Sequence, residues 1–407
     1  MEMMDFAGST GPPRDCHDQP AMMRLQFPRW QHESAMKKSS IVVVAGILLG
    51  VLSGRTAVAA DAIMGVNVRG YGTASERQQD DLIEQLHKSG VTTIRESLPT
   101  NVDERFTRFV THAYKAGIGI VVILYPTQGG TGKHTSPVNP AVGRKWRVPA
   151  LSDADAEGFR KWFTPQLAAL ETAGIRVAAF ELGNEFNTTG YNADLAAPGT
   201  GRVLGLSDLD NPNDAEAHAI AEGYRAYVGI LAVLKDMRDH SQLNGTTPVI
   251  SGGLANVGSP QPQSFNKQLT VSIPDTIEFL RRNGSDRLVD GYGVHVYPNG
   301  DIHQTVSARA SVLDYDFSAC RKDSKPCWLT EWAFNNRNQS CPIDDAMRLQ
   351  LMQAERRAFK PFVEEGRLAA IIYYSWDGDF VGQHENMGAI FRCGALTDAG
   401  KLALRPM

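Results

Sequence analysis

Short apolar runs alternate with helical patterns along the chain from residue 62 onward. Most stretches between the runs carry apolar residues at the three- and four-residue spacing of an amphipathic helix. The predicted strands are 63–67, 91–97, 118–124, 176–182, 248–251, 288–297, 325–332 and 369–376. The predicted helices are 75–89, one ending at Gly117, 152–174, one beginning at Asn213, 276–282, 305–321, 344–365 and 397–404.

This alternation predicts a parallel sheet covered by helices. The run 118–124 is continuously apolar, which is typical of a strand buried on both faces. Eight strand–helix units in one stretch favour a single-domain (β/α)8 TIM barrel over 61–407. A doubly wound open sheet is the alternative, but the segment 65–70 after the first strand lacks the glycine fingerprint of that fold. Three long connections, 125–151, 188–212 and 252–272, predict enlarged loops at one end of the barrel.

Two glutamates stand at strand ends. Glu185 follows the strand 176–182, and Glu331 lies at the end of the strand 325–332. A carboxylate in such a place is costly unless it is paired or used, and the carboxyl ends of barrel strands hold the active sites of this fold. Two glutamates facing one cavity are suited to glycosidic bond cleavage, one as acid/base and one as nucleophile.

The motifs Asn184-Glu185 and Thr330-Glu331-Trp332 resemble those of the clan A retaining glycoside hydrolases, which include families 5 and 39. The resemblance extends over 62–407. It implies that Glu185 is the acid/base, that Glu331 is the nucleophile, and that β-glycosidic bonds are hydrolysed with retention.

The same resemblance implies roles for other strand-end residues. Arg95 would hydrogen-bond the nucleophile and keep it ionised, and Asn184 would bind the sugar 2-hydroxyl. His295 and Tyr297 lie on one face of their strand; His295 would tune the acid/base and Tyr297 would donate to the nucleophile. Trp376 would be an aromatic platform under the sugar. Structural roles stay open for these residues, including a surface ion pair for Arg95 and core positions for His295 and Trp376.

At the end of the strand 118–124 the chain has Leu124-Tyr125-Pro126, where family 5 enzymes often have a histidine. This departure leaves the resemblance to the clan intact. Tyr125 and Asn67 are candidate substrate-binding residues, together with Arg69 and Trp146.

The N-terminal region has the layout of a secretory signal. Lys37 and Lys38 precede an apolar run, 41–52, and the small residues 57–59 form a cleavage site. The apolar run is too short for a comfortable membrane span, although an uncleaved anchor is the alternative. We therefore expect a signal peptide at 36–60, a gene-model extension or disordered tail at 1–35, and export to the periplasm or the extracellular space.

Four cysteines follow the predicted cleavage site, an even number that allows two disulfides in three pairings. Cys320 and Cys327 bracket a short turn, so we expect them to pair, which leaves Cys341 to pair with Cys393. A zinc site is the rival interpretation, but the chain has no Cys-x2-Cys pair.

The formal net charge of −4 gives no reason to expect nucleic acid or an anionic membrane as a partner. The expected partner is a polysaccharide or oligosaccharide, and the protein is expected to be a monomer without stable membrane association after signal cleavage. Because two carboxylates do the chemistry, no metal or organic cofactor is expected. The alternatives are a catalytically silent polysaccharide-binding barrel and a transglycosylase using the same glutamates. The long loops favour a cleft and endo action, whereas the sugar and its linkage are not readable from the sequence.

Overall fold

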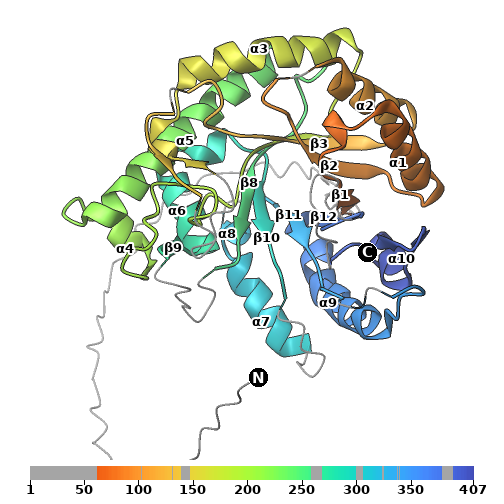
Figure 1. Cartoon of the computed structure of the whole chain (residues 1–407). Coiled ribbons are helices and arrows are strands. Elements are labelled where there is room, and N and C mark those ends of the chain that lie inside the picture. Colours follow the sequence, from red (N-terminus) through yellow and green to blue (C-terminus); the bar gives the residue numbers. More distant parts are fainter. Residues whose placement is uncertain are drawn as a thin grey trace, which may run out of the picture. The chain divides into compact units, whose positions relative to one another are not determined.

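Eight of the described strands close into a parallel barrel in the computed structural model (Figure 1). Around the barrel the order is β1, β12, β11, β10, β8, β6, β3, β2, and β1 pairs with both β12 and β2. The strands are β1 Ile63–Asn67, β2 Thr93–Ser97, β3 Gly119–Leu124, β6 Ala179–Asn184, β8 Val249–Ala255, β10 Tyr292–His295, β11 Cys327–Trp332 and β12 Leu368–Tyr373. The predicted (β/α)8 fold is confirmed.

The structure describes residues 62–407 apart from 102, 131, 139–146, 258–267, 299–305, 323–324, 337, 339 and 378–387. The predicted signal peptide and the segment before it lie outside the described residues, as does Trp146.

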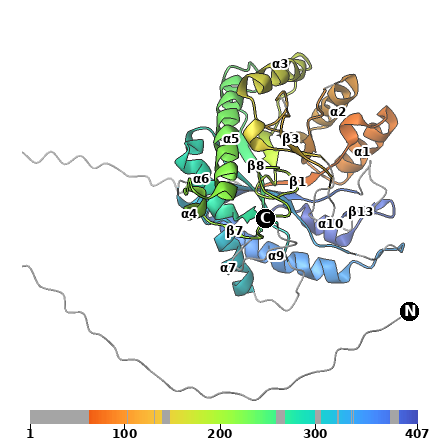
Figure 2. The ribbon, with the colours of Figure 1, turned by 60° about the vertical axis from the view of Figure 1, so that its left-hand side comes forward.

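Helices surround the strands in both views (Figures 1 and 2). The longer ones are α1 Glu76–Lys88, α2 Glu104–Lys115, α3 Ala156–Thr172, α5 Ala215–Asp239, α6 Ile273–Arg282, α7 Val306–Asp316 and α9 Ala346–Glu364. In α2 the periodic apolar residues are the buried ones, and the side chain of Asp103 caps the first turn by accepting from the amides of Arg105 and Phe106. Outward-facing strand residues meet these helices: Phe180 of β6 packs edge-on against Phe163 of α3, with ring centroids 5.7 Å apart.

The barrel interior has an apolar layer and a polar layer. The apolar layer consists of Val121, Ala179, Ile250, Trp328, Ala370 and Ile372. Because side chains alternate along a strand, Glu181 and Thr330 follow Ala179 and Trp328 on the same face, two residues closer to the carboxyl ends. The polar layer therefore lies just below the barrel mouth.

Two small sheets order the long loops. Strand β7 (Val203–Leu204), in the connection after β6, pairs with β9 (Thr270–Val271), in the connection after β8. Strands β4 (Thr135–Ser136) and β5 (Val148–Pro149) pair within the connection after β3. These are the loops that were expected to bind the substrate. The connections after β6 and β8 are joined to each other, and the connection after β3 is joined to itself.

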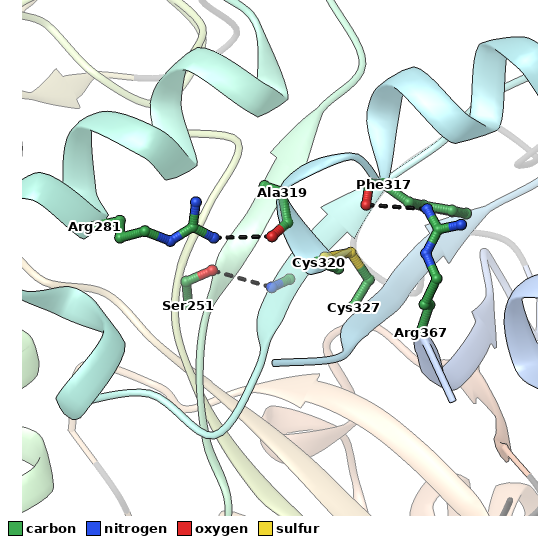
Figure 3. Close-up of a disulfide and its surroundings, with 8 residues drawn as sticks. Ser251, Arg281, Phe317, Ala319, Cys320, Cys327 and Arg367 are labelled. Carbon is green, nitrogen blue, oxygen red and sulfur yellow. Dashed lines mark hydrogen bonds between the residues drawn. A yellow bond between two sulfur atoms is a disulfide. The ribbon is translucent and has the colours of Figure 1, made fainter. Parts of the chain in front are cut away.

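Both predicted disulfides are confirmed, Cys320–Cys327 and Cys341–Cys393. The first joins the short helix α8 (Ala319–Lys322) to the start of β11, the strand that carries Glu331. Figure 3 shows that Arg281 and Arg367 donate to the carbonyls of Ala319 and Phe317 on either side of this bridge. Two disulfides are consistent with an exported protein. Among the described residues, no helix has the length and apolar character needed to cross a bilayer.

Strand boundaries differ from the prediction at several places that affect the site. Strand β6 continues to Asn184, and β10 ends at His295, so Tyr297 lies beyond the strand that was predicted to carry it. Strand β8 continues through Gly252 and Gly253 to Ala255, although these glycines had marked its end. The glycines are needed because neighbours approach closely: a Cβ on Gly253 would lie 2.0 Å from Nε2 of His295. Strand β12 ends at Tyr373, so Trp376 lies beyond it.

Candidate active site

Glu185 and Glu331 lie at the carboxyl ends of β6 and β11. Glu331 is the next-to-last residue of β11 and is 8% exposed, whereas Glu185 directly follows β6 and is partly exposed. Glu185 has a left-handed backbone with φ of 42°, which is uncommon for a residue with a side chain. Its amide donates to the carbonyl of Gly253 at 2.7 Å, and this bond holds the turn that directs the chain out of the strand.

His295, on β10, lies between the two glutamates. Its Nδ1 is 3.0 Å from Oε1 of Glu185 and 3.6 Å from Oε2 of Glu331. One atom from each of the three residues lies within 4.8 Å of the others. The structure therefore brings both carboxylates and a fully buried imidazole together at the barrel mouth.

The surroundings of Glu331 keep it ionised. Burial acts to raise the pKa of Glu331, but three neighbours outweigh it and lower that pKa below its ordinary value: the charge of His295 when its ring is protonated, the charge of Arg95 and the hydroxyl of Tyr297. Arg95 donates from Nη1 to Oε1 at 2.7 Å, and the hydroxyl of Tyr297 donates to Oε2 at 2.5 Å. Burial and the charges of Glu331 and Glu185 raise the pKa of Tyr297, so its hydroxyl retains the proton that it donates.

Arg95 is the centre of the polar layer, and all five of its N–H groups have acceptors. Nη1 donates to Glu331 and to Oδ1 of Asn67 (2.8 Å), and Nη2 donates to Oδ1 of Asn184 (2.9 Å). Nε and Nη2 both donate to Glu181, at 2.5 and 3.1 Å. Burial opposes its charge, but Glu181 and Glu331 raise the pKa of Arg95 above its ordinary value.

The two asparagines differ in position. Asn67 is 2% exposed, and its Nδ2 donates to the carbonyls of Thr330 and Tyr373, so it braces Arg95 instead of facing a substrate. Asn184 lies next to Glu185 with its amide oxygen on Arg95. This bond orients the amide so that its NH2 group points away from the guanidinium.

Trp376 is not brought into this group, which corrects the predicted platform. It is fully buried and stacks on Phe391, with ring centroids 4.9 Å apart. The physical reason is that Trp376 lies three residues beyond the end of β12, where its backbone bonds to Asn67 and Phe391 and its ring packs against Phe391. The aromatic residue that borders the site is Tyr374, which is partly exposed and packs edge-on against Tyr297 at 6.4 Å.

Two further tyrosines border the site, one of them missed by the sequence analysis. Tyr125, a predicted substrate-binding residue, is partly exposed, and its hydroxyl lies 3.5 Å from that of Ser97. Tyr191, in the loop after β6, was not singled out; burial and the charges of Glu185 and Glu331 raise its pKa well above the ordinary value. Burial is the larger cause, and the carboxylates add to it. The place of Tyr191 a few residues after Glu185 in a long loop was the available signal.

Among the described residues, Glu185, His295 and Glu331 also form a set that could hold a metal ion. However, both oxygens of Glu331 already accept hydrogen bonds, and one donor is the positive charge of Arg95. These donors match a carboxylate kept ionised by the protein itself.

No protein-family model and no curated protein sequence matches this chain. Solved structures with a similar fold include an endo-1,4-β-mannanase from Rhizomucor miehei, with a TM-score of 0.51 and 12% identity over 84% of this chain and 93% of that one. A broad-specificity endoglucanase of family GH5 from an uncultured bacterium has a TM-score of 0.50 and 13% identity over 84% and 93%. At such identities the likeness establishes the shared barrel fold.

Proposed function

We propose that this chain is a retaining glycoside hydrolase that cleaves β-glycosidic bonds in a polysaccharide or oligosaccharide. The observation that carries the proposal is the separation of Glu185 and Glu331, whose facing oxygens lie within 4.8 Å. Carboxyl pairs of retaining enzymes stand about 5–5.5 Å apart, whereas inverting pairs need about 6.5–9.5 Å to admit a water molecule. The short separation favours attack by a carboxylate.

In the first step Glu331 attacks the anomeric carbon while Glu185 gives its proton to the departing glycosidic oxygen. Arg95 and Tyr297 keep Glu331 unprotonated, and Nδ1 of His295 lies 3.0 Å from Oε1 of Glu185. In the second step Glu185 takes a proton from water, and the hydroxide displaces Glu331 from the sugar. Two inversions give net retention.

The neighbouring polar groups suit a sugar. The NH2 group of Asn184 is available for a hydroxyl beside the nucleophile, and the rings of Tyr374, Tyr125 and Tyr191 offer aromatic and hydroxyl contacts around the carboxylates. The long connections after β3, β6 and β8 suit binding of an extended chain, so endo action is part of the proposal.

The test is activity of the mature chain on a panel of β-linked polysaccharides and activated aryl β-glycosides. Glu185→Ala and Glu331→Ala are assayed beside Glu104→Ala, which removes an exposed carboxylate from α2. Wild type and the Glu104 variant should be active, and the two site variants should lose nearly all activity.

Azide separates the two roles. With an activated glycoside, azide should rescue Glu331→Ala by direct attack and give the α-glycosyl azide. It should rescue Glu185→Ala by opening the glycosyl–Glu331 ester and give the β-azide. Full activity of either site variant would exclude the carboxylate assignment. A folded wild type that binds a polysaccharide without cleaving it would favour a silent binding barrel, and transfer products at high acceptor concentration would favour a transglycosylase.

A further inference from the structure

A third carboxylate, Glu181, is fully buried in the barrel beside the site. It lies on β6, four residues before Glu185. A buried carboxylate is costly unless it is paired and hydrogen-bonded. Glu181 accepts four hydrogen bonds: two from Arg95, one from the amide of Gly253 (2.9 Å) and one from Oγ1 of Thr330 (2.9 Å). Because it is sealed from solvent, it can act on the chemistry only through the groups that it holds.

The first of these groups is Arg95. Nε and Nη2 grip Glu181 as a fork, which fixes the plane of the guanidinium. In that plane Nη1 points at Glu331, at 2.7 Å. Arg95 is ion-paired with both Glu181 and Glu331, so its positive charge stabilises two carboxylates and not Glu331 alone.

The second group is His295, reached through Thr330. A carboxylate accepts but cannot donate, so the hydroxyl hydrogen of Thr330 is directed at Glu181. The oxygen of Thr330 can then only accept from Nε2 of His295, which is 3.2 Å away. Nη2 of Arg95 also lies 3.5 Å from Nε2, but its two hydrogens are already donated to Glu181 and Asn184, so it does not need Nε2 as an acceptor. Nε2 therefore carries a hydrogen, and in the neutral ring Nδ1 presents its lone pair to Glu185.

We propose that Glu181 is a positioning residue for both halves of the reaction: it aims Arg95 at Glu331 and, through Thr330, sets the tautomer of His295 that faces Glu185. The proposal rests on the proposed function for its kinetic meaning. Its structural content is independent of any substrate. With Nδ1 as acceptor, Glu185 can stay protonated beside the imidazole. With the opposite tautomer, Nδ1–H would donate to Glu185 and favour its ionised form, which is unable to protonate a leaving group.

The tautomer is measured first, in the free protein. The chain has 10 histidines, so nitrogen-15 histidine spectra of wild type and His295→Gln identify the His295 signals by difference. Wild type should show Nε2–H. Thr330→Val, which keeps Glu181 and Arg95, should gain the Nδ1–H form, and Thr330→Ser should restore the wild-type spectrum.

Ser251→Ala is the matched control. It deletes another buried hydroxyl in the barrel, one that accepts from the amide of Gly293 at 3.0 Å (Figure 3). Its His295 signals should equal those of wild type. Nδ1–H in wild type, or a Thr330→Val spectrum identical to that of wild type, would overturn the proposal.

Kinetics then separate the effect of Glu181 on Arg95 from its effect on His295. The substrates are aryl β-glycosides with poor and with good leaving groups, since a good leaving group needs little protonation. Thr330→Val should lower kcat on the poor leaving group by about 10- to 100-fold, the size of the loss when the hydrogen-bond partner of a metal-bound histidine is mutated. It should leave kcat on the good leaving group nearly unchanged. Glu181→Gln should lower both, because its new NH2 group opposes Nε–H of Arg95.

Equal losses on both substrates in Thr330→Val, or wild-type kcat in folded Glu181→Gln, would contradict the assignment. If Glu181→Gln does not fold, Thr330→Val and Thr330→Ser still decide whether Thr330 sets the tautomer of His295. If wild type cleaves no β-glycoside, the proposed function fails, while the tautomer still decides the positioning role of Glu181.

Discussion

Replacing Tyr297 with phenylalanine removes one hydroxyl and leaves the ring in place, so it isolates a single hydrogen bond to the proposed nucleophile. That bond is 2.5 Å long and ends on Oε2 of Glu331, which is buried. A hydrogen bond to a charged group contributes about 1.5–3 kcal/mol. Since one pKa unit corresponds to about 1.4 kcal/mol, losing it should raise the pKa of Glu331 by roughly 1–2 units.

The direction follows from the sign of the contribution. Tyr297 helps to lower the pKa of Glu331, so its removal lets the carboxyl protonate at higher pH. Only the ionised form attacks, and the acidic limb of the kcat/KM profile should therefore move to higher pH by about the same 1–2 units. Arg95 and His295 remain, so the plateau near neutral pH should survive.

The assay is the pH dependence of kcat/KM on an activated β-glycoside, for wild type, Tyr297→Phe and Tyr114→Phe. Tyr114 is 44% exposed on α2, which makes it a matched control whose profile should equal that of wild type. Because His295 lies beside both glutamates, the position of this limb is compared between variants and is not assigned to a single residue. An acidic limb that stays within about 0.3 unit of wild type would refute the role of Tyr297 in holding Glu331 ionised.

Two further predictions concern residues around the site and between helices. Tyr374→Ala should lower kcat/KM several-fold with little change in Tm, whereas Trp376→Ala should lose about 3–5 kcal/mol of stability because the ring is buried; kinetics and thermal unfolding check both, and the opposite pattern would restore Trp376 as the platform. Burial raises the pKa of Glu355 on α9 to about 7, against the charge of Arg309 at 3.2 Å. The folded state then binds a proton that the unfolded state releases above its ordinary pKa, so stability should fall as pH rises from about 4.5 to 7. Glu355→Gln should flatten this fall in a series of unfolding curves, and an unchanged slope would contradict it.

Much of the fold could be predicted because a buried parallel strand has a strong local signal. The run at Gly119–Leu124 is apolar throughout, since both of its faces are covered. The ends of strands were harder to predict where a glycine is needed for close packing and not for a turn. Gly252 and Gly253 lie inside β8 because the backbone of β6 and the ring of His295 leave no room for a Cβ. No local pattern distinguishes such a glycine from one that ends a strand.

The sequence by itself determined that the chain alternates strands with helices and that glutamates end two of the strands, and it favoured one pairing of the four cysteines. These are local properties: periodicity, strand ends and short spacing. Only the tertiary structure decided how far apart Glu185 and Glu331 stand, that Trp376 is buried while Tyr374 borders the site, and that Glu181 holds both Arg95 and Thr330. Those relations join residues that are distant in the sequence, such as Glu181 and Thr330, which are 149 positions apart. They depend on barrel closure and strand register, which no segment of the chain contains alone.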